Sequence, residues 1–306
     1  MFKYSLDNKR YHTLNYFLRN KFNSKVFKVS LNAGFSCPNS KNGKGCIFCS
    51  AGSGDFGGNK NDSLTNQFIN IKEKVSKKWP NSKYIAYFQA NTNTYAPLPV
   101  LKEKYEEVLA LPNVVGLAIA TRSDAISNDT LDYLSELNER TFLSVELGLQ
   151  SIHDKTLKLI NRGHTLENFE KMVKELQKRN IFTVVHIING LPFETKKDMI
   201  ETVKYLNSLK IDAIKIHMLS VIKDSQLEQL YKETKFHILS KEEYIDIVCD
   251  QLELLNEDVV INRITGDPNK DDLIEPTWLL KKFCVLNDID KEMVRRDTYQ
   301  GAKIKE

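Results

Sequence analysis

The stretch KVFKVSLNAGFSCPNSKNGKGCIFC spans residues 25–49. Its beginning, residues 25–33, alternates apolar and polar side chains, which predicts a strand. Three cysteines follow at once, in the spacing C-x8-C-x2-C, as Cys37, Cys46 and Cys49. In parallel α/β folds, ligands bind at the carboxyl ends of the strands, so this loop is the expected place for chemistry.

Further strands and helices alternate along the rest of the chain. The expected strands cover residues 84–89, 114–120, 142–147, 182–188 and 213–219, with a last candidate at 259–264. The expected helices cover residues 63–79, 99–110, 129–137, 154–160, 166–178, 196–209, 225–231, 241–256 and 277–286. About six β-α units with right-handed crossovers predict a parallel sheet. We therefore expect an α/β fold, an incomplete (β/α)6 TIM-like barrel with N- and C-terminal extensions.

The expected domain limits follow from the same pattern. Residues 1–24 form a basic N-terminal extension, residues 25–265 the partial barrel and residues 266–306 a C-terminal helical extension, whose part from 287 onward is a charged tail.

Composition excludes several classes of protein. The chain has 306 residues, of which 41% are hydrophobic and 27% charged, which excludes general disorder and a coiled coil. No apolar run approaches the roughly 18 residues of a membrane span, and the N-terminus lacks a signal-peptide core. We expect a cytoplasmic protein without membrane association.

The basic residues gather at the front of the chain. Residues 1–83 contain 15 Lys and Arg against 4 Asp and Glu, whereas the remainder contains 29 against 36. Basic segments attract polyanions, and aromatic side chains can stack on unpaired bases. Six aromatics are interleaved here: Tyr4, Tyr11, Tyr16, Phe17, Phe22 and Phe27. Either they contact RNA or another polyanion, or they are core residues beside a solvated charged face.

The clustered cysteines indicate a metal centre. An odd total of 5 cysteines without an export signal argues against a disulfide framework. Three thiolates can hold a [4Fe–4S] cluster whose fourth iron stays open. Structural zinc would need a fourth ligand, for which His12 or Cys249 is available, and unligated thiols are the third alternative. Cys249 and Cys284 stand alone in helical patterns and are expected to be buried.

Polar side chains mark the expected strand ends. Glu146 stands in an apolar strand, so it is either a site residue or half of a structural ion pair. His186 and His217 are site residues or satisfied core histidines, and Arg122 is a site residue or a surface ion pair. The pair Asn189–Gly190 allows close approach to a flat ligand. Residues 162–165 precede a helix whose cap is expected at Thr165, with a substrate contact as the alternative.

These segments resemble the radical S-adenosylmethionine (SAM) superfamily over roughly residues 25–265. The signature is the three-cysteine loop with aromatic Phe48 before its last cysteine. More narrowly, the chain is similar to a YhcC/YtqA-like branch, whose core is related to Elp3-type radical SAM domains. The segments that carry this similarity begin at Phe35, Tyr87, Glu146, Asn161 and Thr265.

The resemblance implies the cofactors and their ligands. Cys37, Cys46 and Cys49 would hold a [4Fe–4S] cluster, and SAM would bind its open iron and yield a 5′-deoxyadenosyl radical after one-electron reduction. Phe48 would lie near the adenine and Glu146 near the ribose or amine. Gln89 or Asn91 would replace the family's Gly-Gly-Glu amine contact. Further contacts are expected from Arg122, Gln150, His186, Asn189 and Gly190.

The resemblance also implies a substrate. The branch is tied to tRNA wobble-uridine maturation, from the carboxymethylaminomethyl to the aminomethyl form, with an external flavodoxin- or ferredoxin-type electron donor. Two alternatives remain: a radical SAM enzyme acting on a protein or small metabolite, and a non-catalytic, zinc-stabilised RNA-binding protein.

Overall fold

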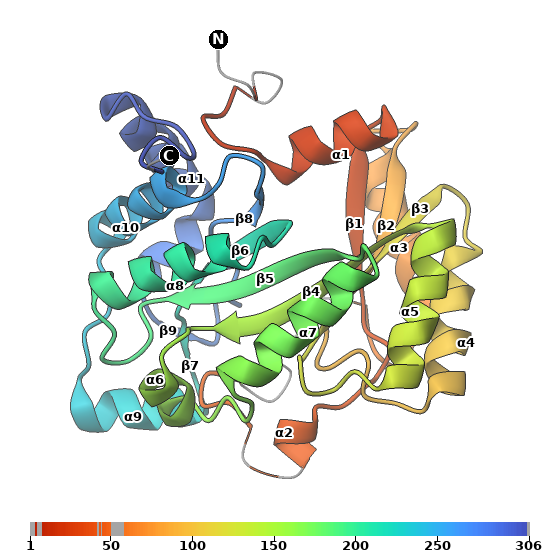
Figure 1. Cartoon of the computed structure of the whole chain (residues 1–306), viewed down its shortest axis with the longest axis horizontal. Helices are drawn as coiled ribbons and strands as arrows, with labels where there is room; N and C mark the ends of the chain where they lie inside the picture. Colours follow the sequence, from red (N-terminus) through yellow and green to blue (C-terminus); the bar gives the residue numbers. More distant parts are fainter. Residues whose placement is uncertain (1–3, 5–7, 42, 44, 50–57, 305–306) are drawn as a thin grey trace.

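A curled, seven-stranded parallel sheet forms the centre of the protein (Figure 1). The computed structural model describes residues 4, 8–41, 43, 45–49 and 58–304. The strands stand in the order β1-β2-β3-β4-β5-β6-β8, each hydrogen-bonded to its neighbours in parallel register. Their bounds are β1 Val26–Leu31, β2 Lys83–Phe88, β3 Val114–Thr121, β4 Phe142–Gln150, β5 Phe182–Asn189, β6 Ala213–Met218 and β8 Val260–Arg263.

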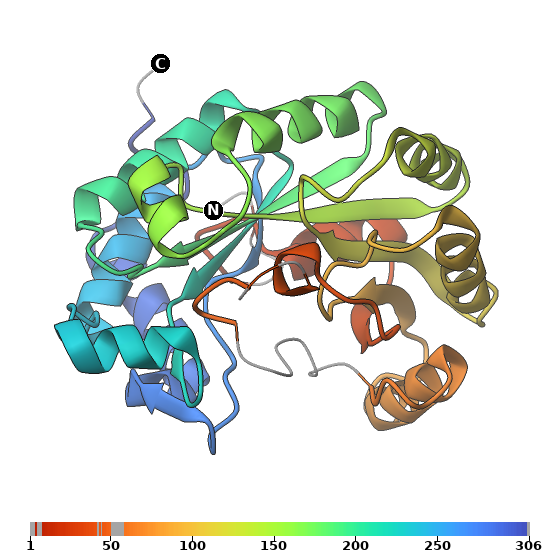
Figure 2. The same ribbon diagram turned by 90° about the horizontal axis from the view of Figure 1, so that it is seen from below.

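The predicted incomplete barrel is confirmed, including its last strand. Strand β8 pairs with β6 and adds a seventh strand to the curled half-barrel (Figure 2). The order follows the chain because each crossover returns to the next position on the sheet. All strand ends that precede a β-α loop therefore lie at one edge.

Helices cover the outer face of this sheet. Outward side chains such as Val29, Phe88 and Leu147 pack with helix residues such as Phe68 and Tyr105 in one large core. Ser63, Thr165 and Ser240 cap their helices with side-chain oxygens, which confirms the cap expected at Thr165. The helix bounds are α2 Pro38–Lys41, α3 Leu64–Ser76, α4 Leu98–Leu109, α5 Asn128–Arg140, α6 Asp154–Leu159, α7 Leu166–Lys178, α8 Lys196–Ser208, α9 Gln226–Thr234 and α10 Lys241–Leu254.

Helix α1 (Leu14–Phe22) covers the amino-terminal end of the barrel. Phe17 stacks on Phe182 with ring centroids 5.0 Å apart, and Phe22 meets Phe142 edge-on at 5.8 Å. Phe142 and Phe182 are the first residues of β4 and β5. The end opposite the cysteine loop is thus plugged by apolar side chains.

The front-end aromatics are packed inside the fold, as the second interpretation predicts. Tyr4 and Tyr11 are each only 5% exposed, Tyr16 packs edge-on against Tyr4, and Phe27 contacts the main core. The packing of these rings in the plug and its surroundings favours the second interpretation, in which they are core residues.

The C-terminal part holds more structure than expected. A 3-10 turn, η2 (Thr277–Lys281), leads into α11 (Lys282–Arg295), which continues nine residues past the predicted end of the helix. Val285, Ile289 and Met293 recur every four residues and are fully buried, so the predicted charged tail is wrong over this stretch. Strands β7 (Val221–Ile222) and β9 (Leu273–Glu275) form a small antiparallel pair.

Within the described ranges, no helix combines the length and apolarity that crossing a bilayer demands.

Candidate active site

The cysteine loop lies at the carboxyl edge of the sheet. After β1, the chain reaches Cys37, whose carbonyl accepts from Ser40 and Lys41 and so starts the short helix α2. Cys46 and Cys49 share a tight turn, in which the Cys49 amide donates to the Cys46 carbonyl at 3.0 Å. Cys37 is partly exposed, Cys46 is buried and Cys49 is exposed. The three cysteines therefore lie on one loop at the edge where a parallel barrel binds its ligands.

Two distant connections hold this loop in place. The amide of Ile47 donates to the carbonyl of Ile160, just after α6, and the carbonyl of Ile47 accepts from Leu227 of α9. The amide side chains also cross: Asn39 donates to the Asn161 carbonyl at 2.8 Å, and Asn161 donates to the Gly45 carbonyl at 2.6 Å. Asn161 adopts a left-handed φ of 50°, which an Asn tolerates well.

Phe48 packs beside these anchors. It is half-buried against a satellite core that includes Ile47, Leu157, Ile160 and Leu191. The structure thus gives the aromatic of the cysteine motif a place between the loop and the end of β5.

Two buried arginines surround Cys46. Arg162 donates to the Gly148 carbonyl and places Nη1 4.0 Å from the Cys46 sulfur. Arg122 donates to the Arg162 carbonyl at 2.9 Å and pairs in a fork with Asp124. A hydrogen bond with Cys49 and the charges of both arginines lower the pKa of Cys46 to about 5, although burial opposes this. A thiolate is the form of cysteine that ligates metal.

Two glycines make room for these arginines. A Cβ at Gly148 would stand 2.8 Å from Arg162 Nη2, and one at Gly163 would stand 2.6 Å from Asn39 Oδ1. Gly163 also has a φ of +80°, a conformation that favours glycine. Arg162 and Gly163 belong to residues 162–165, for which the sequence offered a substrate contact as the alternative to helix capping, although neither was singled out there as a site residue.

The proposed fourth zinc ligands lie elsewhere. His12 precedes α1 at the opposite end of the barrel, and Cys249 is buried in α10 with its thiol toward the Ile289 carbonyl. Burial raises the pKa of Cys249 to about 12, as expected for an inert core thiol. Cys284 is exposed, so its predicted burial is wrong. The donor set therefore fits a cluster held by three thiolates.

The inner face of the barrel carries a polar network around Glu146. Lys28 donates to Glu146 Oε1 at 2.6 Å, Tyr87 donates to Oε2 at 2.9 Å, and Lys215 also donates to Oε2. Burial alone would raise the pKa of Glu146, but the charges of Lys215 and Lys28 hold it well below its ordinary value. Glu146 therefore forms the ion pair of the second interpretation, and its expected contact with SAM stays a prediction.

His186 completes this network. Its Nε2 lies 2.9 Å from Glu146 Oε2, and burial together with the Lys215 charge lowers the pKa of His186 to about 4. The ring is therefore neutral at pH 7 and donates its Nε2 proton, because the carboxylate can only accept. Burial lowers the pKa of Lys215 to about 8. Lys28 and Tyr87 were not among the predicted site residues. Lys28 stands at a polar position of an alternating strand, whereas Lys215, inside the apolar strand β6, was the recognisable signal.

The remaining expected residues are spread over the carboxyl edge. Gln89 accepts from Ser30, and Asn91 is exposed with a left-handed φ of 61°. Gln150 ends β4 with a φ of 75°, and its buried Oε1 finds no hydrogen-bond partner among the described residues.

Asn189 and Gly190 face a different neighbour from the one expected. The amide of Asn189 exchanges two hydrogen bonds with Gln251 of α10, at 2.8 and 2.9 Å. A Cβ at Gly190 would meet Leu239 at 3.2 Å, so a protein side chain makes the close approach there. The side chain of Asn189 is thus occupied within the fold.

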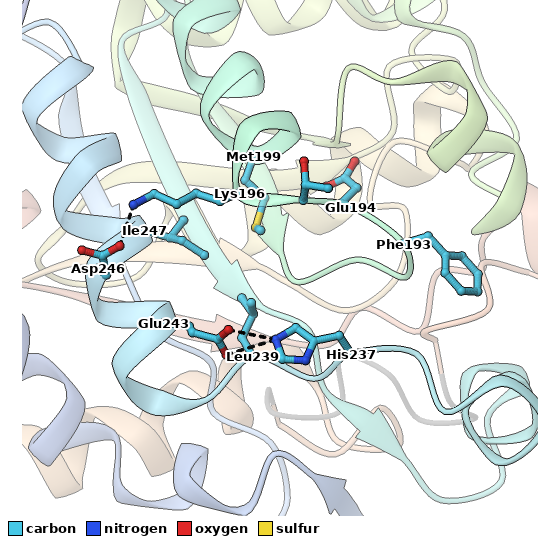
Figure 3. A pocket seen from close by; sticks show the side chains of 10 residues that line it. Phe193, Glu194, Lys196, Met199, His237, Leu239, Glu243, Asp246 and Ile247 are labelled. Atoms are coloured by element: carbon cyan, nitrogen blue, oxygen red, sulfur yellow. Dashed lines mark hydrogen bonds and ion pairs between the residues drawn. The ribbon is translucent and has the colours of Figure 1, made fainter.

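A separate pocket of about 430 Å³ adjoins Gly190 from the helical layer. Met199 and Lys196 of α8 and Ile247 of α10 line it, with His237 and Glu243 paired across its edge (Figure 3). None of the three clustered cysteines lines this pocket, so the cysteine loop remains the candidate active site.

Family models match nearly the whole described fold. Residues 36–206 match the model of the radical SAM superfamily, and residues 211–295 match its C-terminal domain. The first match includes all three clustered cysteines and both buried arginines. The chain belongs to the radical SAM superfamily. Radical SAM proteins use a [4Fe–4S] cluster and SAM, so the reading as a non-catalytic zinc protein is set aside.

Curated relatives place the chain within a branch of that family. It is 50% identical to the uncharacterized protein YtqA of Bacillus subtilis over 98% of this chain and 94% of the relative. It is 30% identical to protein YhcC of Escherichia coli over 90% of this chain and 89% of that relative. The YhcC/YtqA-like assignment is therefore confirmed.

More distant similarity reaches larger proteins. The chain is 29% identical to a tRNA uridine(34) acetyltransferase of Methanocaldococcus infernus, over 50% of this chain and 29% of that one. The solved structure of Methanocaldococcus infernus Elp3 superposes with a TM-score of 0.69 at 19% identity, covering 90% of this chain and 64% of the other. That superposition supports the radical SAM fold of the barrel.

Proposed function

We propose that this protein is a tRNA-modifying radical SAM enzyme, acting at the wobble uridine to convert the carboxymethylaminomethyl to the aminomethyl form. The observation that carries the proposal is the loop with three thiols at the carboxyl edge of a barrel whose inner face carries Lys28 and Lys215. We infer that a substrate base enters the barrel at this edge while the rest of the nucleic acid stays outside.

The cluster and SAM, once bound, supply a 5′-deoxyadenosyl radical that removes a hydrogen atom from the substrate. The residues of this chain prepare the place for that chemistry. Arg162 and Arg122 offset the negative charge of the thiolates, and Asn39 and Asn161 fix the loop that carries them. We assign Phe48, Gln89, Asn91 and Gln150 as the nearest candidates for contacts with SAM.

A tRNA substrate is supported by similarity and by surface charge. Half of the chain is similar to a protein named for its action on tRNA uridine 34. Lys41 of α2 and Lys158 of α6 are exposed on the elements that surround the cysteine loop. Cations in this position suit a phosphate backbone that runs past the mouth of the barrel. A tRNA substrate also places the enzyme in the cytoplasm.

Radical SAM enzymes need an external electron to begin turnover. We propose a flavodoxin- or ferredoxin-type protein as that donor. The exposed Cys49 marks the side of the loop from which an electron reaches the cluster.

Nucleoside mass spectrometry of tRNA tests the proposed function. A strain that lacks the gene should accumulate carboxymethylaminomethyluridine and lose the aminomethyl-derived forms. Return of the wild-type gene should restore them, whereas a Cys37→Ala gene should not. Unchanged tRNA nucleosides in the deletion strain would contradict the tRNA proposal and favour a protein or small-metabolite substrate.

A further inference from the structure

The seven strands carry an unequal set of charges. Glu146 is the one acidic residue in them, whereas the basic residues are Lys28, Lys83, Lys215 and Arg263, of which Lys83 begins β2 and donates to the Phe22 carbonyl at the opposite end. Lys28 and Lys215 both contact Glu146, so a single carboxylate serves two lysines on the inner face. One positive charge of this pair remains without an opposite charge within the network.

A β-bulge turns a third cation toward the same place. Val260 packs in the inner plug and Ile261 in the outer core, so simple alternation would point Arg263 outward. The register instead shifts between Ile214 and Lys215, and Arg263 becomes the direct partner of Lys215. Bulges next to active sites often re-aim a side chain in this way. The charge of Arg263 accordingly acts to lower the pKa values of Tyr87, Lys215 and His217, as one of several contributions to each.

The neighbours of Arg263 leave it partly available. Asp267 lies 3.8 Å from it, but the same carboxylate is only 2.6 Å from Lys282. The Arg263 side chain keeps 31% of its exposure. Among the described residues, the Arg263 guanidinium therefore has only a distant carboxylate, shared with Lys282, as its counter-charge.

His217 adds an unsatisfied polar atom to this corner. It lies two residues after Lys215 on β6, hence on the same face, with its ring 5.3 Å from that of His186. Its Nε2 is buried and has no hydrogen-bond partner among the described residues. Buried polar atoms in proteins nearly always have a partner, so an orphan here indicates a missing ligand or water.

We propose that Arg263, Lys215 and His217 form a subsite for a carboxylate group of the substrate. This inference rests on the proposed function and names the part of the substrate that enters the barrel: the carboxymethyl end of the modified uridine. A guanidinium fork beside an ammonium group matches a carboxylate in both shape and charge. SAM also carries a carboxylate, and the experiment must separate the two sources.

Equilibrium dialysis with two nucleosides tests the subsite. The anaerobically reconstituted full chain with saturating SAM is offered 5-carboxymethylaminomethyluridine, or 5-aminomethyluridine, which lacks the carboxylate. The wild type should bind the first more tightly by about tenfold or more, the effect of one charged hydrogen bond. Arg263→Gln should lose that preference, whereas Arg140→Gln, a matched change on exposed helix α5, should keep it.

Two further measurements separate a substrate subsite from a SAM subsite: the affinity for SAM, and the binding of a small carboxylate probe. The dissociation constant of SAM should change less than about twofold in Arg263→Gln; a parallel loss of SAM binding would overturn the inference. N-methylglycine, followed by saturation-transfer NMR, reports the subsite independently of uridine. If N-methylglycine binds the wild type but not Arg263→Gln, the subsite is supported even when neither nucleoside binds. Failure of both nucleosides to bind would count against the tRNA substrate only. If the deletion strain confirms the tRNA reaction but Arg263→Gln retains its carboxylate preference, only the subsite is wrong.

Discussion

Cys46 is the thiol whose surroundings are most completely built by the protein. Arg162, Arg122 and Asn39 reach it from three different parts of the chain. Their charges and hydrogen bonds favour the thiolate before any metal arrives, which lowers the cost of deprotonation on cluster binding.

Cys46→Ser should therefore abolish stable cluster assembly. Bound iron should fall from about four per chain toward zero, with loss of the broad absorbance near ~400 nm and of 5′-deoxyadenosine formation. Cys284→Ser is the control, because that thiol is exposed on α11 and outside the loop. Native iron content in the Cys46 variant would contradict its assignment as a ligand.

Glu146 makes the inner face of the barrel sensitive to acid. Its pKa is well below the ordinary 4.5, so its contribution to stability is fully present above that pH and is lost as pH falls further. Glu146→Gln leaves Lys28 and Lys215 without their buried counter-charge and should cost about 3–5 kcal/mol of unfolding free energy at pH 7. Urea unfolding at several pH values between 3 and 7 measures both effects.

The dependence of unfolding free energy on pH in Glu146→Gln shows whether this ion pair causes the acid sensitivity. If the ion pair stabilises the fold, the variant should lose less stability than the wild type between pH 5 and pH 3. Parallel profiles for the two proteins would show that acid acts elsewhere. Glu107→Gln, which removes a carboxylate bonded to Thr65 on the outer helices, is the control.

The partners of Glu146 could not be predicted from the sequence. Lys28 and Lys215 are 118 and 69 residues away from Glu146 along the chain, and only the curl of the sheet brings β1, β4 and β6 close enough for these contacts. Glu146 itself was recognisable, because a carboxylate in an apolar strand must have a partner. The three cysteines were recognisable for another reason. They lie close together in the sequence, and few kinds of site use three thiols in this spacing.

At the scale of elements, periodicity predicted the strands well. Every strand of the large sheet was expected within a few residues, since buried parallel strands read as short apolar runs between helical segments. Helix α1 was missed because its apolar residues lie among basic ones, and its burial depends on Phe142 and Phe182 far along the chain. The length of α11 was underestimated, although its buried positions, spaced four apart among charged residues, follow the helical period.

The connection between α6 and α7 acts as a clamp on the cysteine loop. Asn161→Gly removes the side-chain bond to Gly45 while keeping a residue that accepts the left-handed backbone. The variant should lose about 1 kcal/mol of stability and release its iron faster to a chelator. Asn180→Gly is the matched control, because Asn180 has a φ of 53° at another helix-strand connection. Equal iron release by the two variants would show that the clamp does not hold the loop.

Gly148 provides a second test of the same region. A Cβ at this position would press on Arg162 Nη2 and Gln150 Nε2, each 2.8 Å away. Gly148→Ala should displace the arginine and raise the pKa of Cys46, since one of its two nearby positive charges moves away. Alkylation of the apo-protein across pH 4–8, read by peptide mass spectrometry at Cys46, measures that change. An unshifted alkylation profile would show that Arg162 does not set the pKa.

At the scale of the whole molecule, two pairs of basic residues lie at opposite ends of the barrel. Arg19 and Lys21 lie on α1, at the plugged amino-terminal end, although one of the two sequence interpretations had the front segment contact RNA or another polyanion. Lys41 and Lys158 lie on α2 and α6, beside the cysteine loop (Figure 1). A polyanion that delivers a base to the cysteines must pass the second pair, and only the fold reveals which lysines those are.

Charge reversal at each end separates these contributions. Lys41→Glu with Lys158→Glu should weaken tRNA binding about tenfold or more at ~50 mM salt and make the slope of log affinity against log salt shallower by roughly two. Arg19→Glu with Lys21→Glu changes the net charge equally but should leave affinity within about twofold, because those side chains face away from the mouth. Filter binding of bulk tRNA at several salt concentrations measures both. Equal losses of tRNA affinity in the two double variants would mean that binding depends on net charge alone. The cysteine end of the barrel would then not be the tRNA-binding surface.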